Sequence, residues 1–337
     1  MAQRYGLEIE CFGLDTAELR AAIESVNGLN YGGHFHYHGS RTLGLRCSEN
    51  GNGNVWVSED DSSLTNTAGR GFCHEVISPV MEGEAGLRTV GKVMTALSRA
   101  GAKVNRSCGL HTTFGIENSS ARFRRMSAKK KAQRICAIVD AYDYFMAGFD
   151  SLVSPSRRFY EGRASSYASA IRYPHGTSNA FGLQTAEDAQ TIVERGVGRG
   201  YLNIGSFLSK GIIEFRQHNG TLSRWKIYNW SLLLQRLVQW ALNDRHTNHG
   251  CDVRNFAPTL HGLIEMLDCG SDLTTALLAR ADELQGVLPM NTTYHYDARM
   301  TEHEDFIMRR DLPAAAVAAI DAAEENGRWV VVEGVDA

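Results

Sequence analysis

One segment in the second half of the chain combines strand-forming and charged residues: Gly211-Ile212-Ile213-Glu214-Phe215-Arg216-Gln217-His218-Asn219-Gly220-Thr221. Side chains on a β-strand alternate between its two faces, so a strand over 212–217 places Glu214 and Arg216 together, opposite its apolar side chains. A carboxylate and a guanidinium so placed can form an exposed ion pair, or they can serve a phosphate site. A similar stretch near the start of the chain, Gly6-Leu7-Glu8-Ile9-Glu10, favours the second interpretation.

The composition describes a globular protein without a strong charge bias. The chain has 337 residues, of which 43% are hydrophobic and 22% charged, enough for a substantial core. Its net charge of -3, from 35 basic and 38 acidic residues, gives no reason to expect a nucleic-acid or membrane partner. The one basic run, over 122–131, is typical of the solvated start of a helix, although a phosphate contact there stays open.

The cysteines and the N-terminus predict a cytoplasmic location. Seven cysteines are scattered without a Cys-x-x-Cys pair, which suggests neither a zinc knuckle nor a disulfide framework and favours a reducing compartment. A candidate functional strand begins at about Tyr5, which leaves no room for a signal peptide, and no apolar run is long enough to span a membrane.

The order of the expected elements predicts an α+β fold, because strands and helices alternate and residues 198–204 and 212–217 look like two arms of a hairpin. A capping box beginning at Asp15 opens the first helix. No clear linker interrupts the chain, so we expect a catalytic domain over 1–245 and a mainly helical extension over 246–337. The expected strands lie near 5–12, 55–57, 72–80, 107–116, 198–204, 212–217 and 328–332, and the expected helices near 15–26, 84–100, 120–150, 185–196, 224–242, 259–267, 273–285 and 313–325.

Two irregular regions are candidates for substrate recognition. Residues 30–55 contain the alternating histidines of Gly33-His34-Phe35-His36-Tyr37-His38, which could bind a metal but more readily form a polar loop near a substrate entrance. Residues 154–182 form a long loop rich in anion donors, and long loops within compact domains are often functional.

Several polar side chains are expected to project from strand faces. Carboxylates with few nitrogen ligands suit Mg²⁺ or Mn²⁺, and two such ions with an arginine can hold the phosphates of a nucleotide. Spacing alone does not show that these strands are neighbours, so isolated surface residues remain an alternative. The candidates are Glu8, Glu10, Glu75, His111 and Glu214, with Arg216.

An ordered set of motifs over roughly residues 5–235 resembles the amidoligases, a family of the carboxylate-amine ligase superfamily that includes glutamine synthetase and glutamate-cysteine ligase. The motifs are Gly6-x-Glu8-x-Glu10, Trp56-x-x-x-Asp60-Asp61-x-Ser63-Leu64, Glu75-x-x-Ser78-Pro79, Cys108-Gly109-x-His111, Arg199-x-Tyr201-x-Asn203 and Glu214-Phe215-Arg216-x-His218-x-Gly220-Thr221.

The resemblance implies a curved antiparallel sheet that forms a glutamine-synthetase-like funnel, packed by helices, with ATP entering at one end. It implies that Arg216 contacts the transferring phosphate, with Arg199 and Asn203 as further ATP-binding residues. Asp61 and Ser63 would lie near the substrate or orient the site. The family often has a second histidine where this chain has Thr113. The implied ligands of Mg²⁺ or Mn²⁺ are Glu8, Glu10, Glu75, His111 and Glu214.

The implied reaction is ATP-dependent amide formation through an acyl phosphate, which requires no serine or cysteine nucleophile. The chain has neither a nucleophile-elbow motif nor a P-loop, so metals and arginines would hold ATP. The partners would be a small amine and a carboxylate, free or carried on a peptide or protein, and a homo-oligomer fits the superfamily. A metal-dependent hydrolase, a phosphotransferase, and a non-enzymatic binding or scaffold protein remain alternatives.

Overall fold

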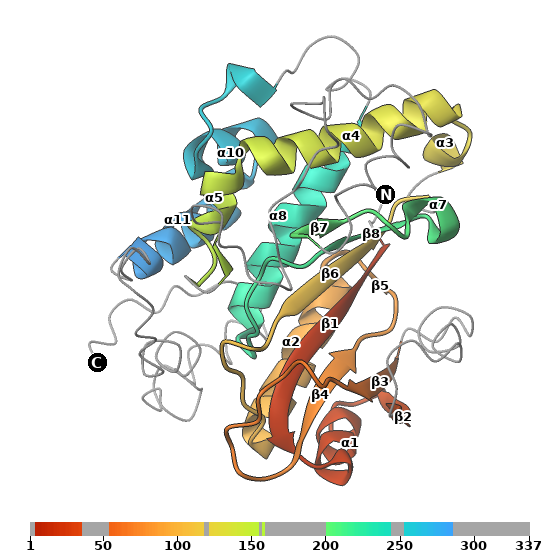
Figure 1. Ribbon diagram of the computed structural model, residues 1–337, viewed down its shortest axis with the longest axis vertical. Helices are drawn as coiled ribbons and strands as arrows, with labels where there is room; N and C mark the ends of the chain where they lie inside the picture. Colours follow the sequence, from red (N-terminus) through yellow and green to blue (C-terminus); the bar gives the residue numbers. More distant parts are fainter. Residues whose placement is uncertain are drawn as a thin grey trace.

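The computed structural model describes residues 4–35, 54–117, 121–154, 157–158, 200–243 and 253–285 (Figure 1). The expected helices near 185–196 and 313–325, the expected strand near 328–332, His36, His38 and most of the 154–182 loop lie outside these residues. None of the helices in the described part of the chain combines the length and the apolar character that a membrane crossing requires.

The described strands form one sheet in the order β2-β3-β4-β1-β6-β8-β7, with β5 paired to β1. Neighbouring strands are antiparallel except for β2 and β3, which are parallel. The fold is therefore a mixed α/β arrangement with a mostly antiparallel sheet, as the order of elements predicted. The strands are β1 (Arg4–Leu14), β2 (Asn30–Phe35), β3 (Val55–Asp60), β4 (Phe72–Ile77), β5 (Met81–Glu82), β6 (Leu110–Gly115), β7 (Leu202–Asn203) and β8 (Ile212–Phe215).

The helices follow the expected apolar periodicity, and two elements, one helix and one strand, differ in extent from the prediction. The expected helix over 120–150 is divided, because Ser127 caps a new helix at Ala128 and the backbone leaves helical geometry at Phe145. The expected strand over 198–204 is reduced to β7. The helices are α1 (Thr16–Glu24), α2 (Gly83–Ala100), α3 (Ala121–Arg124), α4 (Ala128–Tyr144), α5 (Met146–Asp150), α7 (Phe207–Lys210), α8 (Arg224–Leu242), α10 (Leu260–Leu267) and α11 (Gly270–Gln285), and η5 (Val253–Asn255) is a 3-10 turn.

The capping box at the first helix is confirmed. Asp15 Oδ1 accepts a hydrogen bond of 2.8 Å from Glu18 N, and Glu18 Oε2 accepts one of 2.9 Å from Asp15 N. These two bonds satisfy backbone donors that the helix itself leaves unpaired.

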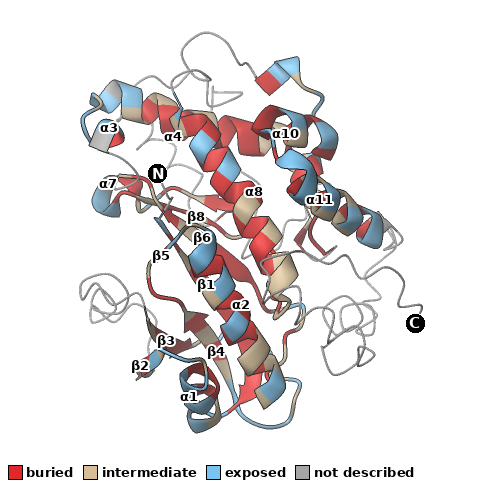
Figure 2. Ribbon diagram, turned by 180° about the vertical axis from the view of Figure 1, so that it is seen from behind, coloured by how far each residue is buried: buried red, intermediate tan, exposed pale blue. Residues whose placement is uncertain are grey.

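The hydrophobic core lies between one face of the sheet and the helices α2, α4 and α8. Figure 2 shows α2 and α8 in front of the sheet when the molecule is seen from behind, and Figure 1 shows the strands in front of α2. An aromatic series joins α4 to the sheet: the ring centroids of Tyr142 and Phe215 lie 5.2 Å apart, those of Phe215 and Phe114 5.7 Å, and those of Phe114 and Tyr5 6.2 Å. Because strand side chains alternate, Glu8, Glu10, His111 and Glu214 face away from this core.

Candidate metal centre

Cross-strand pairing brings distant parts of the chain together around β1. Glu8 lies opposite His111 in the β1–β6 pair, and Glu10 lies opposite Glu75 in the β1–β4 pair. Residues directly opposite each other on antiparallel strands share a face, so these four side chains project from the same side of the sheet. Glu214 joins them from β8, which pairs with β6.

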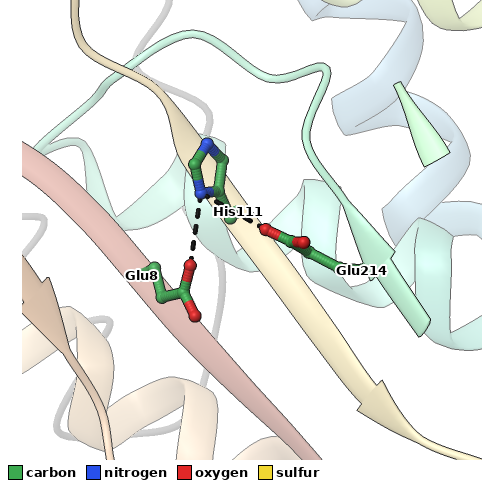
Figure 3. A group of neighbouring side chains, drawn as sticks. All are labelled: Glu8, His111 and Glu214. Carbon is green, nitrogen blue, oxygen red and sulfur yellow. Dashed lines mark hydrogen bonds and ion pairs between the residues drawn. The ribbon is translucent and has the colours of Figure 1, made fainter. Parts of the chain in front are cut away.

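His111 lies at the centre of this group, which we call the carboxylate cluster (Glu8, Glu10, Glu75, Glu214 and His111). Its Nδ1 lies 3.3 Å from Glu8 Oε2, 3.5 Å from Glu214 Oε1 and 3.8 Å from Glu75 Oε1. Its Nε2 lies 3.4 Å from Glu10 Oε1. Figure 3 shows the imidazole between Glu8 on β1 and Glu214 on β8. The structure therefore brings all five candidate metal ligands together.

Two overlapping sets within the cluster have the spacing of metal ligands. Glu8, His111 and Glu214 form one set, and Glu10, Glu75 and His111 form the other; in each set the ligand atoms lie within 4.8 Å of one another. The second set is the deeper one, because the Glu10 side chain is 7% exposed and the Glu8 side chain 32%. Oxygen-rich sets with a single imidazole can hold Mg²⁺ or Mn²⁺.

The carboxylates differ in their affinity for protons. Burial, followed by the charges of Glu8 and Glu10, raises the pKa of Glu75 well above its ordinary value. Burial also acts to raise the pKa of Glu8, but the hydrogen bond and the charge of His111 outweigh it and lower that pKa. A carboxyl that stays protonated beside an ionised one reduces repulsion within the cluster, and a divalent cation would replace that proton.

Arg216 and Asn203 fix the orientation of Glu214. Arg216 Nη1 forms an ion pair with Glu214 Oε1, and Asn203 Nδ2 donates a hydrogen bond of 2.9 Å to Glu214 Oε2. Within the described part of the chain, the buried Arg216 Nε has no hydrogen-bond acceptor. Two of the three residues expected to bind the nucleotide therefore adjoin the cluster, and the third, Arg199, lies outside the described residues.

Asp61 lies near the cluster, and Ser63 holds it there. Asp61 is buried just after β3, and its Oδ1 accepts a hydrogen bond of 2.7 Å from Ser63 N. The charge of Asp61 contributes to the raised pKa of Glu75, which places the two carboxyls in the same electrostatic environment. Thr113 lies opposite Glu214, two residues from His111 along β6, and is half-buried.

One buried carboxylate was not among the sequence candidates. Glu59 lies opposite Glu75 in the β3–β4 pair and is 3% exposed. It precedes Asp61 by two residues, so the alternation of strand side chains could have identified it. Glu59 extends the row of acidic side chains from β1 through β4 to β3.

The described part of the histidine-rich loop points elsewhere. His34 Nδ1 lies 2.8 Å from Ser58 Oγ, and His34 Nε2 lies 2.9 Å from Asp60 Oδ1. Ser58 and Asp60 alternate with Glu59 on β3, so this hydrogen-bonded group belongs to the other face of the sheet. Both nitrogens of His34 are thus engaged outside the carboxylate cluster.

His218, from the last motif, is also turned away from the cluster. It is buried, its ring centroid lies 5.0 Å from that of Trp230, and its Nδ1 lies 2.7 Å from Asn219 O. Burial and then the charges of Arg280, Lys226 and Arg157 lower its pKa to about 3. This histidine therefore stays neutral in the folded protein at neutral pH.

The free energy of unfolding should consequently decrease as the pH is lowered below 6.5. The unfolded state takes up a proton at His218 near pH 6.5 and the folded state only near pH 3, so this contribution is present at neutral pH and is lost on acidification. Between pH 7 and pH 5 the loss should be about 2 kcal/mol.

Urea unfolding at the two pH values should show this loss in the wild type but not in His218→Gln. His261→Gln, at an exposed position on α10, is the matched control and should retain the wild-type pH dependence. An unchanged pH dependence in His218→Gln would contradict the assignment.

Comparison with protein families gives a match to residues 1–138, for the family described as "Putative amidoligase enzyme". This range contains Glu8, Glu10, Glu75 and His111, and it ends before Glu214 and Arg216. The resemblance indicated by the sequence motifs is thus confirmed over residues 1–138.

Among solved structures, one titled "GmaS/ADP complex-Conformation 1" is similar at 10% sequence identity. The alignment covers 95% of this chain and 73% of that chain, with a TM-score of 0.39, which is too low to define a shared fold. Comparison with curated proteins gave no match.

Proposed function

We propose that the protein is an ATP- and Mg²⁺-dependent ligase that joins a carboxylate to an amine through an acyl phosphate. The observation that carries this proposal is the convergence of four carboxylates on His111, beside Arg216, on the sheet face opposite the hydrophobic core. The match to an amidoligase family supports it independently. The same proposal includes a curved, funnel-shaped sheet like that of glutamine synthetase, a catalytic domain over 1–245, an extension over 246–337, and a cytoplasmic location.

The residues of the cluster fit divalent cations. Glu8, Glu10, Glu75, His111 and Glu214 would hold Mg²⁺ or Mn²⁺ in one or both of the two ligand sets. Such ions would neutralise the charge of phosphate oxygens. Because the cluster contains several carboxylates, a phosphorylated substrate would be repelled from it without this neutralisation.

Arg216 is suited to the transferring phosphate. One of its nitrogens is anchored on Glu214, which fixes the guanidinium beside the first ligand set. The Arg216 side chain is 24% exposed, so its guanidinium remains available to donate to a phosphate oxygen. In the proposed reaction, Arg216 stabilises charge on the phosphate, and Asn203 keeps Glu214 in place. Arg199 would bind the nucleotide as well.

Asp61 and Ser63 would orient the substrate end of the site. The hydrogen bond from Ser63 N holds the Asp61 carboxylate on the acidic side of the sheet. A carboxylate there can bind an incoming ammonium group before it loses a proton. The amine and the carboxylate would be small molecules, free or carried by a peptide or protein, and the enzyme would act as a monomer or a homo-oligomer.

The test is nucleotide turnover with defined substrate pools. Release of ADP and phosphate should require Mg²⁺, an amine and a carboxylate together, when amino acids, polyamines and peptides are supplied. Glu214→Gln is the control and should release neither product. A failure of the protein to bind any nucleotide with Mg²⁺ present would overturn the proposal.

The same assay separates the alternatives that share the site. Turnover without ATP would indicate a hydrolase, and a phosphorylated product without an amide would indicate a phosphotransferase. A non-enzymatic scaffold is disfavoured because the carboxylates converge rather than point apart. Several carboxylates held close together repel one another, and a divalent cation would relieve that repulsion.

A further inference from the structure

A second arginine, Arg157, approaches the carboxylate cluster at Gly109. Arg157 is 6% exposed, and its Nη2 donates hydrogen bonds to the backbone oxygens of Cys108, at 2.5 Å, and Ser107, at 3.4 Å. These carbonyl groups immediately precede Gly109 and the strand that carries His111. The guanidinium is thus attached to the turn that leads into the cluster.

Gly109 is the point at which this arginine and the cluster meet. A Cβ on Gly109 would lie 3.1 Å from Arg157 Nη2, 3.1 Å from His111 Nε2 and 3.3 Å from Glu10 Oε2. Gly109 N also donates a hydrogen bond of 2.5 Å to Glu10 Oε2. The end groups of three side chains therefore surround one glycine, and the position of its backbone affects both Glu10 and His111.

Burial of this guanidinium indicates a role beyond that of a surface ion pair. A buried arginine is costly unless hydrogen bonds and nearby negative charge compensate it. Here the two carbonyl oxygens provide hydrogen bonds, and the Glu10 carboxylate lies beside the same glycine. The adjacent Arg158 makes comparable bonds away from the cluster, from Nε to Val153 O at 3.0 Å and from Nη2 to Leu284 O at 3.4 Å.

We propose that Arg157 is a positioning residue for the deeper cation position, formed by Glu10, Glu75 and His111. It holds the turn at Ser107–Gly109 so that Gly109 N fixes Glu10 and the following strand presents His111. This inference rests on the proposed metal site and adds to it a residue that does not itself touch the cation. Residues that orient metal ligands commonly affect metal affinity by about 10–100-fold.

The charge of Arg157 and its positioning effect predict opposite results. A positive charge near a cation site weakens cation binding, so removing the guanidinium would tighten binding if charge alone mattered. If positioning dominates, removing it should weaken binding even though the site becomes more negative. The direction of the change therefore distinguishes the two effects.

The experiment is a calorimetric titration with Mn²⁺ alone. The wild type is expected to bind Mn²⁺, and Arg157→Ala should bind it about 10–100-fold more weakly. Arg157→Lys keeps the positive charge but not the planar guanidinium, so its affinity for Mn²⁺ should lie between those of the wild type and Arg157→Ala. Arg158→Ala is the matched control and should bind Mn²⁺ as the wild type does.

Each other outcome has a defined meaning. Equal or tighter Mn²⁺ binding by Arg157→Ala, or equal weakening in Arg158→Ala, would overturn the positioning role while leaving the metal site intact. A wild type that binds no Mn²⁺ would overturn the metal site as well. If circular dichroism shows that Arg157→Ala does not fold, Arg157→Lys decides: affinity equal to or tighter than the wild type overturns the proposal.

Discussion

Glu214→Gln and Arg216→Ala should each reduce turnover by about 10²–10³-fold or more, and Glu214→Gln should do so with little change in thermal stability. Both residues act at the first ligand set, where Glu214 lies 3.5 Å from His111 Nδ1 and forms the ion pair with Arg216. Loss of Glu214 removes a proposed metal ligand, and loss of Arg216 removes the donor proposed for the phosphate. Neither function can be supplied by the remaining side chains.

Stability should change little because the cluster contains like charges. Glu214→Gln keeps the shape of the side chain and can still accept the hydrogen bond from Asn203 Nδ2, while one negative charge is removed. Residues that assemble a functional site often contribute little to folding or oppose it. A shift of the melting temperature of no more than about 2–4 °C, equivalent to about 1 kcal/mol, is expected for Glu214→Gln.

Glu117→Gln is the matched control for these variants. Glu117 Oε1 forms an ion pair of 2.6 Å with Lys131 Nζ, and neither residue belongs to the carboxylate cluster. This substitution should leave both turnover and melting temperature near the wild-type values. Calorimetric melting combined with the ADP-release assay makes the comparison. If Glu214→Gln and Arg216→Ala both lose a large part of their folding stability, the pair is structural and its catalytic role is refuted.

Strand periodicity was sufficient to predict which side chains project together, but not which strands are neighbours. Glu8 and Glu10 share a face because they are two residues apart, and the same local rule applies to Glu214 and Arg216. That β1 lies between β4 and β6 depends on pairing between segments far apart in sequence. Only the structure therefore shows that Glu75 and His111 lie opposite the two carboxylates of β1.

The residues that were missed show where periodicity fails. Glu59 is not a residue of the Trp56-x-x-x-Asp60-Asp61 motif, although strand alternation places it on the same face as Asp61. Arg157 belongs to an irregular segment without a repeating pattern, so no rule of spacing could place its guanidinium beside Gly109. The division of the helix over 120–150 depends on the cap formed by Ser127 rather than on the apolar residues that continue on both sides of it.

Gly109→Ala should weaken metal binding by about 10–100-fold while the protein remains folded. A methyl group at this position would lie 3.1 Å from His111 Nε2 and 3.3 Å from Glu10 Oε2, closer than most Cβ contacts in proteins. The end groups of these side chains can move by a few tenths of an ångström, which limits the cost to folding. Metal ligands tolerate only about 0.2 Å of displacement, so the same movement is large for a coordinated cation.

Gly115→Ala is the matched control, because it introduces the same methyl group at the far end of the same strand. Its Cβ would lie 3.9 Å from the nearest atoms, those of Arg4, and should disturb nothing in the cluster. Mn²⁺ titration and thermal melting of the two variants provide the comparison. If both alanine variants bind Mn²⁺ with wild-type affinity, the spacing around Gly109 does not govern the site. If Gly109→Ala alone binds weakly and still melts near the wild-type temperature, the glycine of the Cys108-Gly109-x-His111 motif is required by the crowding of ligands around it rather than by the fold.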